Sequence, residues 1–511
     1  MGKHMLNLAE LREVLANVPA GRLVVGLFIH FANISQDEWM DTLARHLREA
    51  GIVTVGIVTP RSRSVCHLEE PDIVAMVEAG DLASLRGIDV FIISDMDHSS
   101  AHFPQNCPVI GCSHNSFVNP DDGLPHCISF SALMDAWLMP APLTEVARNK
   151  IASLWSGMVC APASRRRSKY FHIIPLGSLR LAALKEKMQS PPDKDVLVYA
   201  PMNCNFEPER GGRRLYEHGI RIIATLLAAF PHIKIIFRPY KDDLEKDEVR
   251  HICAEFAANG RFSLDMESGR AASFSRAAVL LTDFSHVGSS FNLAAGRPAI
   301  YFEPWQNTGR GLEKCDGNFW CDTYDGLIDA VGQCFARLES LSNEIRAKMD
   351  ARALPVDGVF THMAQIASDL SRGTTRDEWL TIHRREEPPN DDEELRLVQR
   401  ILGQPGNCVA DMAIAAAVYA NPGSPLLAAL ALHQCLILRP EALFFQPFRL
   451  VVENHIKSER PLYRYKHAGI ASVRRLYEVA LAYALRKRDM PRRQFIESML
   501  DTVSISGAGY R

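Results

Sequence analysis

A serine-bearing loop separates two apolar runs in the stretch LLTDFSHVGSSFNLAAGRPAIYFEP, which extends from Leu280 to Pro304. The loop follows a run of strand length and precedes a helix that begins near Ser289. In a parallel sheet such a loop lies at the carboxyl edge, where ligands bind. Phosphate is attracted by the free N–H groups and the dipole of a helix start, and small residues such as Ser285 and Ser290 would let it approach. The loop is therefore a candidate phosphate site, and a set of turn and cap residues without a ligand is the alternative.

The loop also contains a carboxylate, Asp283, and an imidazole, His286, and the carboxylate needs a role other than direct contact with phosphate. The carboxylate of Asp283, at the end of the strand, would repel a phosphate directly. We expect it to accept a hydrogen bond from a hydroxyl, to cap the turn or to orient His286. The hydroxyls of Ser285 and Ser289 can donate to an anion.

Apolar runs and amphipathic segments predict the elements that position the loop. From residue 22 to residue 60 the chain reads as strand, helix, strand, a crossover unit that favours a parallel sheet. After the polar, proline-containing linker at 189–195 the alternation starts again. Strands are predicted at 22–31, 52–60, 88–95, 107–114, 196–201, 233–240, 277–283 and 298–304, and helices at 36–50, 213–230, 242–258 and 324–338.

These units predict an α/β fold of two Rossmann-like lobes with a C-terminal α-helical domain. We assign residues 1–190 to the first lobe, 191–374 to the second and 375–511 to the helical domain. Ligands are expected in the cleft between the lobes. The last segment has Ala/Leu-rich helices separated by Asn-Pro-Gly and Arg-Pro turns, similar to a tetratricopeptide-like unit but without its clean repeat. Its function is left open.

Composition is that of a globular protein with well-filled cores. The chain has 511 residues, of which 47% are apolar and 23% charged, and its net charge of -3 gives no general attraction for nucleic acid. Its 12 cysteines are scattered without zinc-site spacing, which indicates reduced thiols and a cytoplasmic protein. No apolar run is long enough to cross a bilayer. The basic run at 163–170 is interpreted as a solvated loop, with peripheral contact at the inner face of the cell membrane as the alternative.

The loop stretch resembles the signature T-D-[YF]-S-S-x-x-x-[DE]-[FY]-x-x-L-x-[RK]-P-x-I-[FY] of the CDP-glycerol glycerophosphotransferase family, the teichoic-acid polymerases. This family has the glycosyltransferase-B fold of two Rossmann lobes, and the resemblance covers about residues 105–336. His286 stands where the family has a second serine, and Ser290 where it often has an acid. The residues that match in place are Thr282, Asp283, Phe284, Ser285 and Phe291, and those that match after one extra residue are Arg297, Pro298, Ile300 and Tyr301.

Two other segments resemble the same family. The stretch KIIFRPY is similar to a strand that ends in Arg-x-His, with Arg238 matching and Tyr240 in place of the histidine. The stretch CPVIGCSHNSF is similar to the segment that supplies the family's first-lobe histidine, which gives that role to His114. The first lobe would then be the acceptor side and the second the nucleotide-donor side.

The resemblance implies a transferase whose donor is a nucleotide diphosphate-linked alcohol, similar to CDP-glycerol, and whose acceptor is a cell-surface glycan or polyol phosphate. A histidine suits removal of the acceptor proton near neutral pH, so His114 is the candidate base. The implied donor-binding residues are Arg238, Tyr240, Thr282, Asp283, Ser285, His286, Ser289 and Ser290. Arg238 could instead pair with a carboxylate such as Asp242.

Two other functions stay open: an ordinary nucleotide-sugar glycosyltransferase, and a non-catalytic scaffold that acts through the helical domain. The polar strand ends at His30 and in Asp95–His98 would lie near the first-lobe cleft. A metal role for the Asp-Met-Asp-His run is disfavoured, because Asp-x-Asp sites belong to a different glycosyltransferase fold. No resident cofactor or metal is expected.

Overall fold

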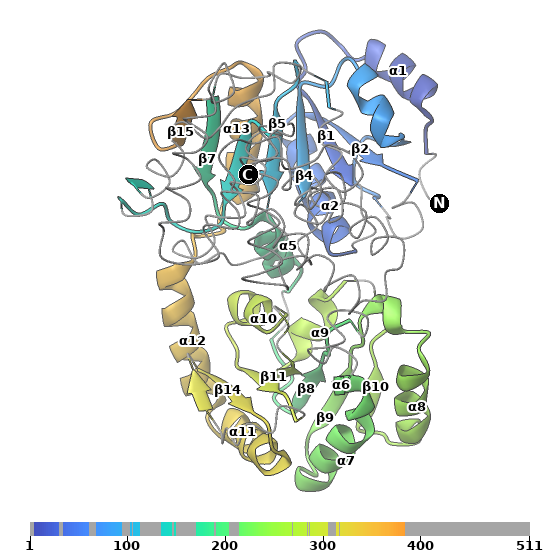
Figure 1. Cartoon of the computed structure of the whole chain (residues 1–511), viewed down its shortest axis with the longest axis vertical. Helices are drawn as coiled ribbons and strands as arrows, with labels where there is room; N and C mark the ends of the chain where they lie inside the picture. The colour runs from blue at the N-terminus through green and yellow to red at the C-terminus, as the bar shows by residue number, and fades with distance from the viewer. Residues whose placement is uncertain are drawn as a thin grey trace, which may run out of the picture.

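The fold is two lobes, each built on a mainly parallel sheet (Figure 1). The computed structural model describes residues 5–29, 34–60, 68–94, 103–104, 106–112, 134–145, 148–149, 170–188, 191–203, 214–267, 269–283, 285, 287–304, 313–315 and 317–383. The predicted helical domain at 375–511 lies outside these residues apart from its first nine positions, 375–383.

The first lobe has an eight-stranded sheet in the order β15-β7-β6-β5-β4-β1-β2-β3. All neighbouring pairs are parallel except β15 with β7. The strands are β1 (Val24–Ile29), β2 (Val53–Val58), β3 (Ile73–Met76), β4 (Val90–Ser94), β5 (Val109–Cys112), β6 (Ala136–Met139), β7 (Tyr170–Pro175) and β15 (Leu380–His383). Its helices are α1 (Leu8–Ala16), α2 (Ile34–Glu49), α5 (Leu179–Lys187) and α13 (Val359–Ser371).

The second lobe has a seven-stranded sheet in the order β10-β9-β8-β11-β12-β14-β13, in which only β13 is antiparallel to its neighbour. The strands are β8 (Val196–Tyr199), β9 (Lys234–Phe237), β10 (Phe262–Leu264), β11 (Val279–Thr282), β12 (Ala299–Phe302), β13 (Glu313–Cys315) and β14 (Asn318–Cys321). The helices are α6 (Arg214–Glu217), α7 (Gly219–Ala229), α8 (Asp247–Phe256), α9 (Ala271–Arg276), α10 (Val287–Ala295), α11 (Tyr324–Ala336) and α12 (Leu338–Arg352). Two Rossmann-like lobes are therefore confirmed.

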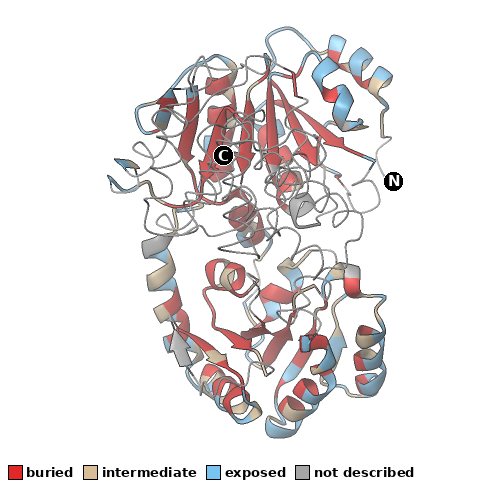
Figure 2. Cartoon of the chain, viewed as in Figure 1, coloured by how far each residue is buried: buried red, intermediate tan, exposed pale blue. Residues whose placement is uncertain are grey.

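Every residue of β1, β2, β8 and β11 is buried, as the continuous apolar runs predicted for strands covered on both faces (Figure 2). The turn from α2 to β2 uses Gly51 at φ +81°, a left-handed conformation that suits glycine, as predicted. The predicted helix at 213–230 is divided into α6 and α7 around His218.

Helix α5 belongs to the cores of both lobes. Leu179 and Ala183 lie in the first-lobe core with α2 and α13, whereas Leu184 packs with Phe291 of α10 and Phe274 of α9. Figure 1 shows α5 between the two lobes, directly beside α10. The start of α10 is therefore tied to the junction of the lobes.

The chain returns to the first lobe after α12. Phe360 and Met363 of α13 lie in the first-lobe core, and β15 extends the first-lobe sheet by pairing with β7. The sequence predicts residues up to 374 in the second lobe and no strand beyond them. The pairing of β15 and the packing of α13 show that this assignment of 359–383 is wrong. The reason is that the partners of this segment, α2 and β7, are distant in the sequence, and such contacts leave no local pattern.

Candidate functional site

The second sheet has a topological switch point, because the helices connected to one half of its strands cover one face and those connected to β11 cover the other. The helices α7 and α8, which follow β8 and β9, cover one face together with α11. The helices α9 and α10, which flank β11, cover the other face. The reversal lies between the neighbouring strands β8 and β11, and ligands of open α/β sheets bind outside the carboxyl ends of strands at such a point.

Asp283 lies at this switch point and connects the ends of both strands. Its carboxylate accepts hydrogen bonds from the N–H of Met202, after β8, at 3.0 Å and from the N–H of Ser285 at 3.0 Å. The side chain is fully buried, and burial raises the pKa of its carboxyl to about 6, although both N–H donors oppose the shift. Thr282 donates through Oγ1 to the carbonyl of Ala200 at 2.7 Å and is also buried. Two of the roles predicted for Asp283 are seen: it caps the turn, and its Oδ1 accepts from the Thr282 hydroxyl at 3.4 Å. Its predicted partner His286 lies outside the described residues, and neither Asp283 nor Thr282 is exposed to a ligand.

The serines of the loop differ in exposure. Ser285 and Ser289 are half-buried, whereas Ser290 is buried at 4% exposure and faces the core rather than solvent. Oγ of Ser285 accepts from the N–H of Val287 at 3.3 Å, and its carbonyl accepts from the N–H of Gly288 at 3.2 Å. A phosphate that binds at this helix start would therefore have to replace Ser285 as the acceptor of these N–H groups. Ser289 is the hydroxyl that can donate to the phosphate more directly.

Gly288 allows the first turn of α10 to lie on Tyr301 of β12. A Cβ at this glycine would lie 2.4 Å from the hydroxyl oxygen of Tyr301 and 2.6 Å from its Cζ. The Tyr301 ring is itself stacked on Trp320, with ring centroids 4.1 Å apart. The ring therefore cannot move aside to admit a methyl group.

We expect Gly288→Ala to destabilise the protein by about 1–3 kcal/mol, because overpacking at the α10–β12 contact must displace the helix. Gly332→Ala, within helix α11, is the matched control. A Cβ at Gly332 would meet only the ring of Phe230, at an ordinary contact distance of 3.7 Å. The control should gain about 0.5–1 kcal/mol from helix propensity. Urea unfolding of both variants measures the difference, and equal stabilities would contradict the expected clash.

Arg238 and Tyr240 follow β9 at the same sheet edge. The guanidinium of Arg238 is paired with Asp265 at 2.5 Å and donates to the carbonyl of Glu267 at 3.3 Å. The ion pair with a local carboxylate, which the sequence left open, is thus present with Asp265 as the partner, and the side chain of Asp242 lies outside the described residues. Tyr240 is 42% exposed, and its N–H donates to Tyr216 Oη at 2.9 Å. Arg238 as a donor-binding residue stays a prediction.

Several sequence-predicted residues lie outside the described residues. These are His286 in the loop, the candidate base His114, the strand-end residues His30, Asp95, Asp97 and His98, and the basic run at 163–169. In the sequence, His114 follows Cys112, the last residue of β5, by two positions. Their predicted roles stay predictions.

A cluster that sequence reasoning missed lies where α7 and α11 begin. Nδ1 of His218 lies 2.9 Å from Oη of Tyr324, and the guanidinium carbon of Arg221 lies 4.0 Å from the centre of the Tyr324 ring. The sequence offered one signal, the glycine at 219 that follows His218 inside an otherwise helical pattern. We call His218, Arg221 and Tyr324 the His218 cluster.

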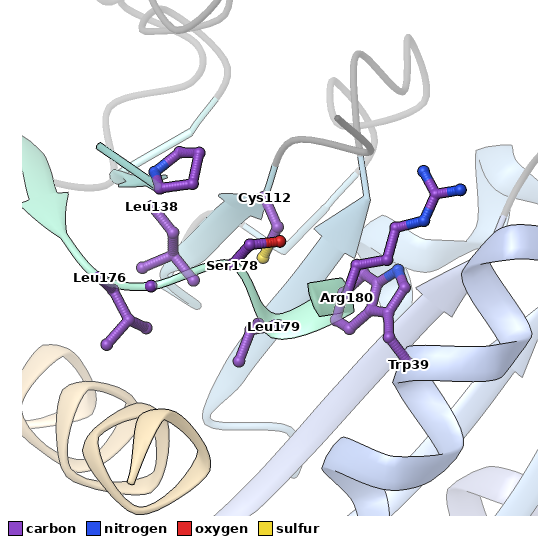
Figure 3. A pocket seen from close by; sticks show the side chains of 9 residues that line it. Trp39, Cys112, Leu138, Leu176, Ser178, Leu179 and Arg180 are labelled. Atoms are coloured by element: carbon purple, nitrogen blue, oxygen red, sulfur yellow. The ribbon is translucent and has the colours of Figure 1, made fainter. Parts of the chain in front are cut away.

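A small hollow of about 10 Å³, roughly the room of one water molecule, lies open to solvent in the first lobe where β5, β6 and β7 end and α5 begins (Figure 3). Ser178 caps α5 by accepting from the N–H of Leu181 at 3.2 Å. Figure 3 shows that most lining side chains are apolar, with the guanidinium of Arg180 at one end beside Trp39. The lining residues are Trp39, Cys112, Leu138, Pro140, Leu176, Gly177, Ser178, Leu179 and Arg180.

The described part of the chain holds neither a metal-ligand cluster nor a membrane-spanning helix. Within it, no three or more His, Cys, Asp or Glu side chains are grouped so that they would hold a metal ion. Nor does any helix there combine the length and the hydropathy of a bilayer-spanning segment.

Two Rossmann-like lobes with parallel sheets, joined through α5 and by a chain that returns to the first lobe, define the glycosyltransferase-B architecture. No protein-family model matches the chain, and no curated protein matches it. The topology of the two lobes thus supports the architecture that the resemblance implies, while assignment to the CDP-glycerol family remains a hypothesis.

Similar solved structures include a UDP complex, a UDP-GlcNAc 2-epimerase and a glycosyltransferase. The MnaA protein of S. aureus with UDP is 10% identical over 71% of this chain and 99% of its own, with a TM-score of 0.45. The UDP-GlcNAc 2-epimerase of Neisseria meningitidis bound to UDP-GlcNAc is 14% identical over 67% and 98%, with a TM-score of 0.43. A glycosyltransferase from Rickettsia africae is 8% identical over 69% and 100%, with a TM-score of 0.41. At these values the likenesses are not evidence of function, which must be argued from the residues of this chain.

Proposed function

We propose that the protein is a transferase that binds a nucleotide diphosphate-linked donor at the β11–α10 loop. The observation that carries the proposal is the position of this loop. Asp283 fixes the turn at the switch point through two main-chain hydrogen bonds, and this leaves Ser285 and Ser289 half-exposed at the start of α10. A helix start with hydroxyl donors at such a point suits a diphosphate.

The proposed reaction moves a polyol-phosphate or sugar unit to a cell-surface glycan or polyol phosphate. In the first form, the acceptor oxygen forms a bond to the phosphorus of the polyol phosphate, and the nucleoside monophosphate leaves with the electrons of the broken P–O bond. In the second, the acceptor attacks an anomeric carbon and the nucleoside diphosphate leaves. In both, the acceptor proton passes to a base, for which His114 is the candidate. The nucleotide product therefore distinguishes the glycerophosphotransferase from the glycosyltransferase.

In this proposal the first lobe takes the acceptor, as the resemblance implies. A resident cofactor or metal has no role in this proposal. Contact with a membrane surface through the basic run at 163–170 remains an alternative means of reaching the acceptor.

Donor binding tests the proposal. The wild-type protein is titrated calorimetrically with UDP, CDP, CDP-glycerol, CDP-ribitol and a panel of nucleotide sugars. Ser289→Ala is expected to weaken diphosphate binding about tenfold, because one hydrogen bond to a charged group is lost. Ser263→Ala, an exposed serine on the edge strand β10, is the control and should bind as the wild type does.

The outcomes separate the alternatives. A protein that binds none of these ligands contradicts the proposal and favours the scaffold that acts through the helical domain. Binding with release of the nucleoside monophosphate supports the polyol-phosphate transfer, and release of the diphosphate supports the glycosyl transfer. Unchanged binding in Ser289→Ala would remove the loop from the donor site.

A further inference from the structure

The His218 cluster lies on the second flank of the switch point. Helix α7 begins at Gly219, directly after His218, and α11 begins at Tyr324, after its N-cap Thr323. Both helices follow strands of the same parallel sheet, so both begin at its carboxyl edge. They pack side by side on the face opposite α10 (Figure 1).

Tyr324 is the fixed centre of this cluster. Its ring meets Phe302 edge-on, with centroids 5.3 Å apart, and its hydroxyl is 2.9 Å from Nδ1 of His218. Arg221 is exposed in the first turn of α7, and its guanidinium lies over the Tyr324 ring. The three side chains thus hold an imidazole and a guanidinium in fixed positions at the edge of the sheet.

The local charge is predominantly positive. The pKa of His218 is lowered, first by burial and then by the positive charges of Arg221 and Arg214, while Glu217 acts in the opposite direction. The imidazole is therefore neutral at neutral pH, and a bound anion would favour its protonation. Among the described residues of α6, α7 and α11, Arg221, Arg214 and Glu217 act on the charge of His218, and the Tyr324 hydroxyl contacts its ring.

Tyr199, the last residue of β8, connects this cluster with the serine loop. Its hydroxyl donates to the carbonyl of Leu215 at 2.6 Å and would lie 3.8 Å from a Cβ at Gly219, so it lies beneath the start of α7. The pKa of Tyr199 is raised by burial and, to a smaller degree, by Asp283 and Tyr324. One buried side chain is thus within electrostatic reach of the loop and of the cluster.

We infer that His218 and Arg221 bind phosphate oxygens of the nucleoside diphosphate from the α7 side, while the serine loop binds it from the α10 side, with Tyr324 positioning the imidazole. The inference rests on the proposed function, since it concerns the same donor. It adds two binding residues and one positioning residue that the sequence did not indicate. The competing account is a purely structural contact that holds α7 against α11.

Binding of UDP and CDP, compared with uridine and cytidine, is the test. The variants are His218→Gln, Arg221→Gln and Tyr324→Phe, and Arg337→Gln is the control because this exposed arginine lies at the other end of α11. Arg221→Gln and His218→Gln should each weaken binding of the diphosphates about tenfold and leave the nucleosides unchanged. Tyr324→Phe keeps the ring and removes only the hydroxyl, so it should weaken binding by a smaller factor.

The pH dependence gives a readout that a structural contact would not change. Protonation of His218 in the complex should strengthen binding of UDP by the wild type as the pH falls from 7.5 to 5.5. The phosphate of UDP titrates in the same range, at a pKa of about 6, and the dependence that remains in His218→Gln measures that contribution. The difference between the two profiles belongs to His218.

The outcomes separate this inference from the proposed function. If the wild type binds neither UDP nor CDP, the proposed function fails. If the wild type binds both, but Arg221→Gln and His218→Gln bind equally well with the same pH profile, only the present inference is overturned. Should His218→Gln melt early, Arg221→Gln decides the matter, because this exposed side chain can be replaced without disturbing the core.

Discussion

Replacing Asp283 with alanine is expected to destabilise the protein by about 2–4 kcal/mol, because two main-chain N–H groups at the switch point lose their acceptor. The carboxylate accepts from Met202 at 3.0 Å and from Ser285 at 3.0 Å, and it is fully buried, so water cannot readily replace it. Asp329→Ala is the control, since this aspartate on α11 is exposed and should change stability by less than about 0.5 kcal/mol. Urea unfolding at constant pH measures both.

Asp283→Asn tests the same residue through pH. Burial raises the pKa of the folded carboxyl to about 6, above its ordinary value of 3.8. Between these values the folded state binds more protons than the unfolded state, so the contribution of Asp283 is fully present below pH 3.8 and is lost as the pH rises through 6. The stability advantage of the wild type over Asp283→Asn should therefore shrink between pH 4 and pH 6. A constant advantage over that range would contradict the raised pKa.

The two variants also separate stability from binding. Asparagine keeps one acceptor oxygen, so Asp283→Asn should retain more of the turn at residues 283–285 than Asp283→Ala. If the β11–α10 loop binds the donor, affinity should decrease in the order wild type, Asp283→Asn, Asp283→Ala at temperatures where all three are folded. Loss of stability without loss of affinity would show that the loop holds the sheet together and has no part in donor binding.

The two-lobed fold was predictable because its central strands are covered on both faces. Such strands read as continuous apolar runs, and those of β1, β2, β8 and β11 mark the strands correctly. The short edge strand β10 lacks such a run, since Ser263 is exposed and its neighbours are only half-buried, and it was not predicted. The return of β15 to β7 was not predictable either, because its partners lie about 210 residues earlier.

The position of the serine loop at the carboxyl edge of the sheet was predictable, but the contacts of its individual residues were not. The Thr-Asp pair at the end of a strand and the small residues after it indicated the strand-to-helix turn. That Asp283 is a cap to Met202 and that Ser290 faces the core depend on packing, which a spacing pattern does not contain. The contact between His218 and Tyr324 joins residues 106 positions apart, and the partner of Arg238 lies 27 positions away. Tertiary contacts of this kind leave no periodic signal.

Replacing Gly177 with alanine should have the other large effect, a loss of about 3 kcal/mol, at the top of the range for overpacked sites. A Cβ at this position would lie 2.2 Å from the carbonyl oxygen of Pro355 and 3.2 Å from Cα of Val356. These are backbone atoms of the segment between α12 and α13, and unlike the end of a flexible side chain they cannot turn away. The methyl group must therefore displace either this segment or the start of α5.

Displacement of the returning segment would reach the core of the first lobe. Val356 packs against that core, and α13 follows it with Phe360 and Met363 buried among residues of α2 and α5. Hydrogen exchange should therefore show faster exchange of the amides of α13 and β15 in Gly177→Ala, while the strands of the second lobe keep their protection.

Gly260→Ala is the control for this substitution. Gly260 lies in the turn after α8, and nothing lies within 4 Å of a Cβ built there. Neither glycine has a positive φ, so the two variants differ in the space around the new methyl group and not in backbone strain. Equal unfolding free energies for the two variants would mean that the chain can shift at Pro355 at little cost. The returning segment would then be a loosely held connection, and the junction of the lobes would depend on the contact of α5 with α10.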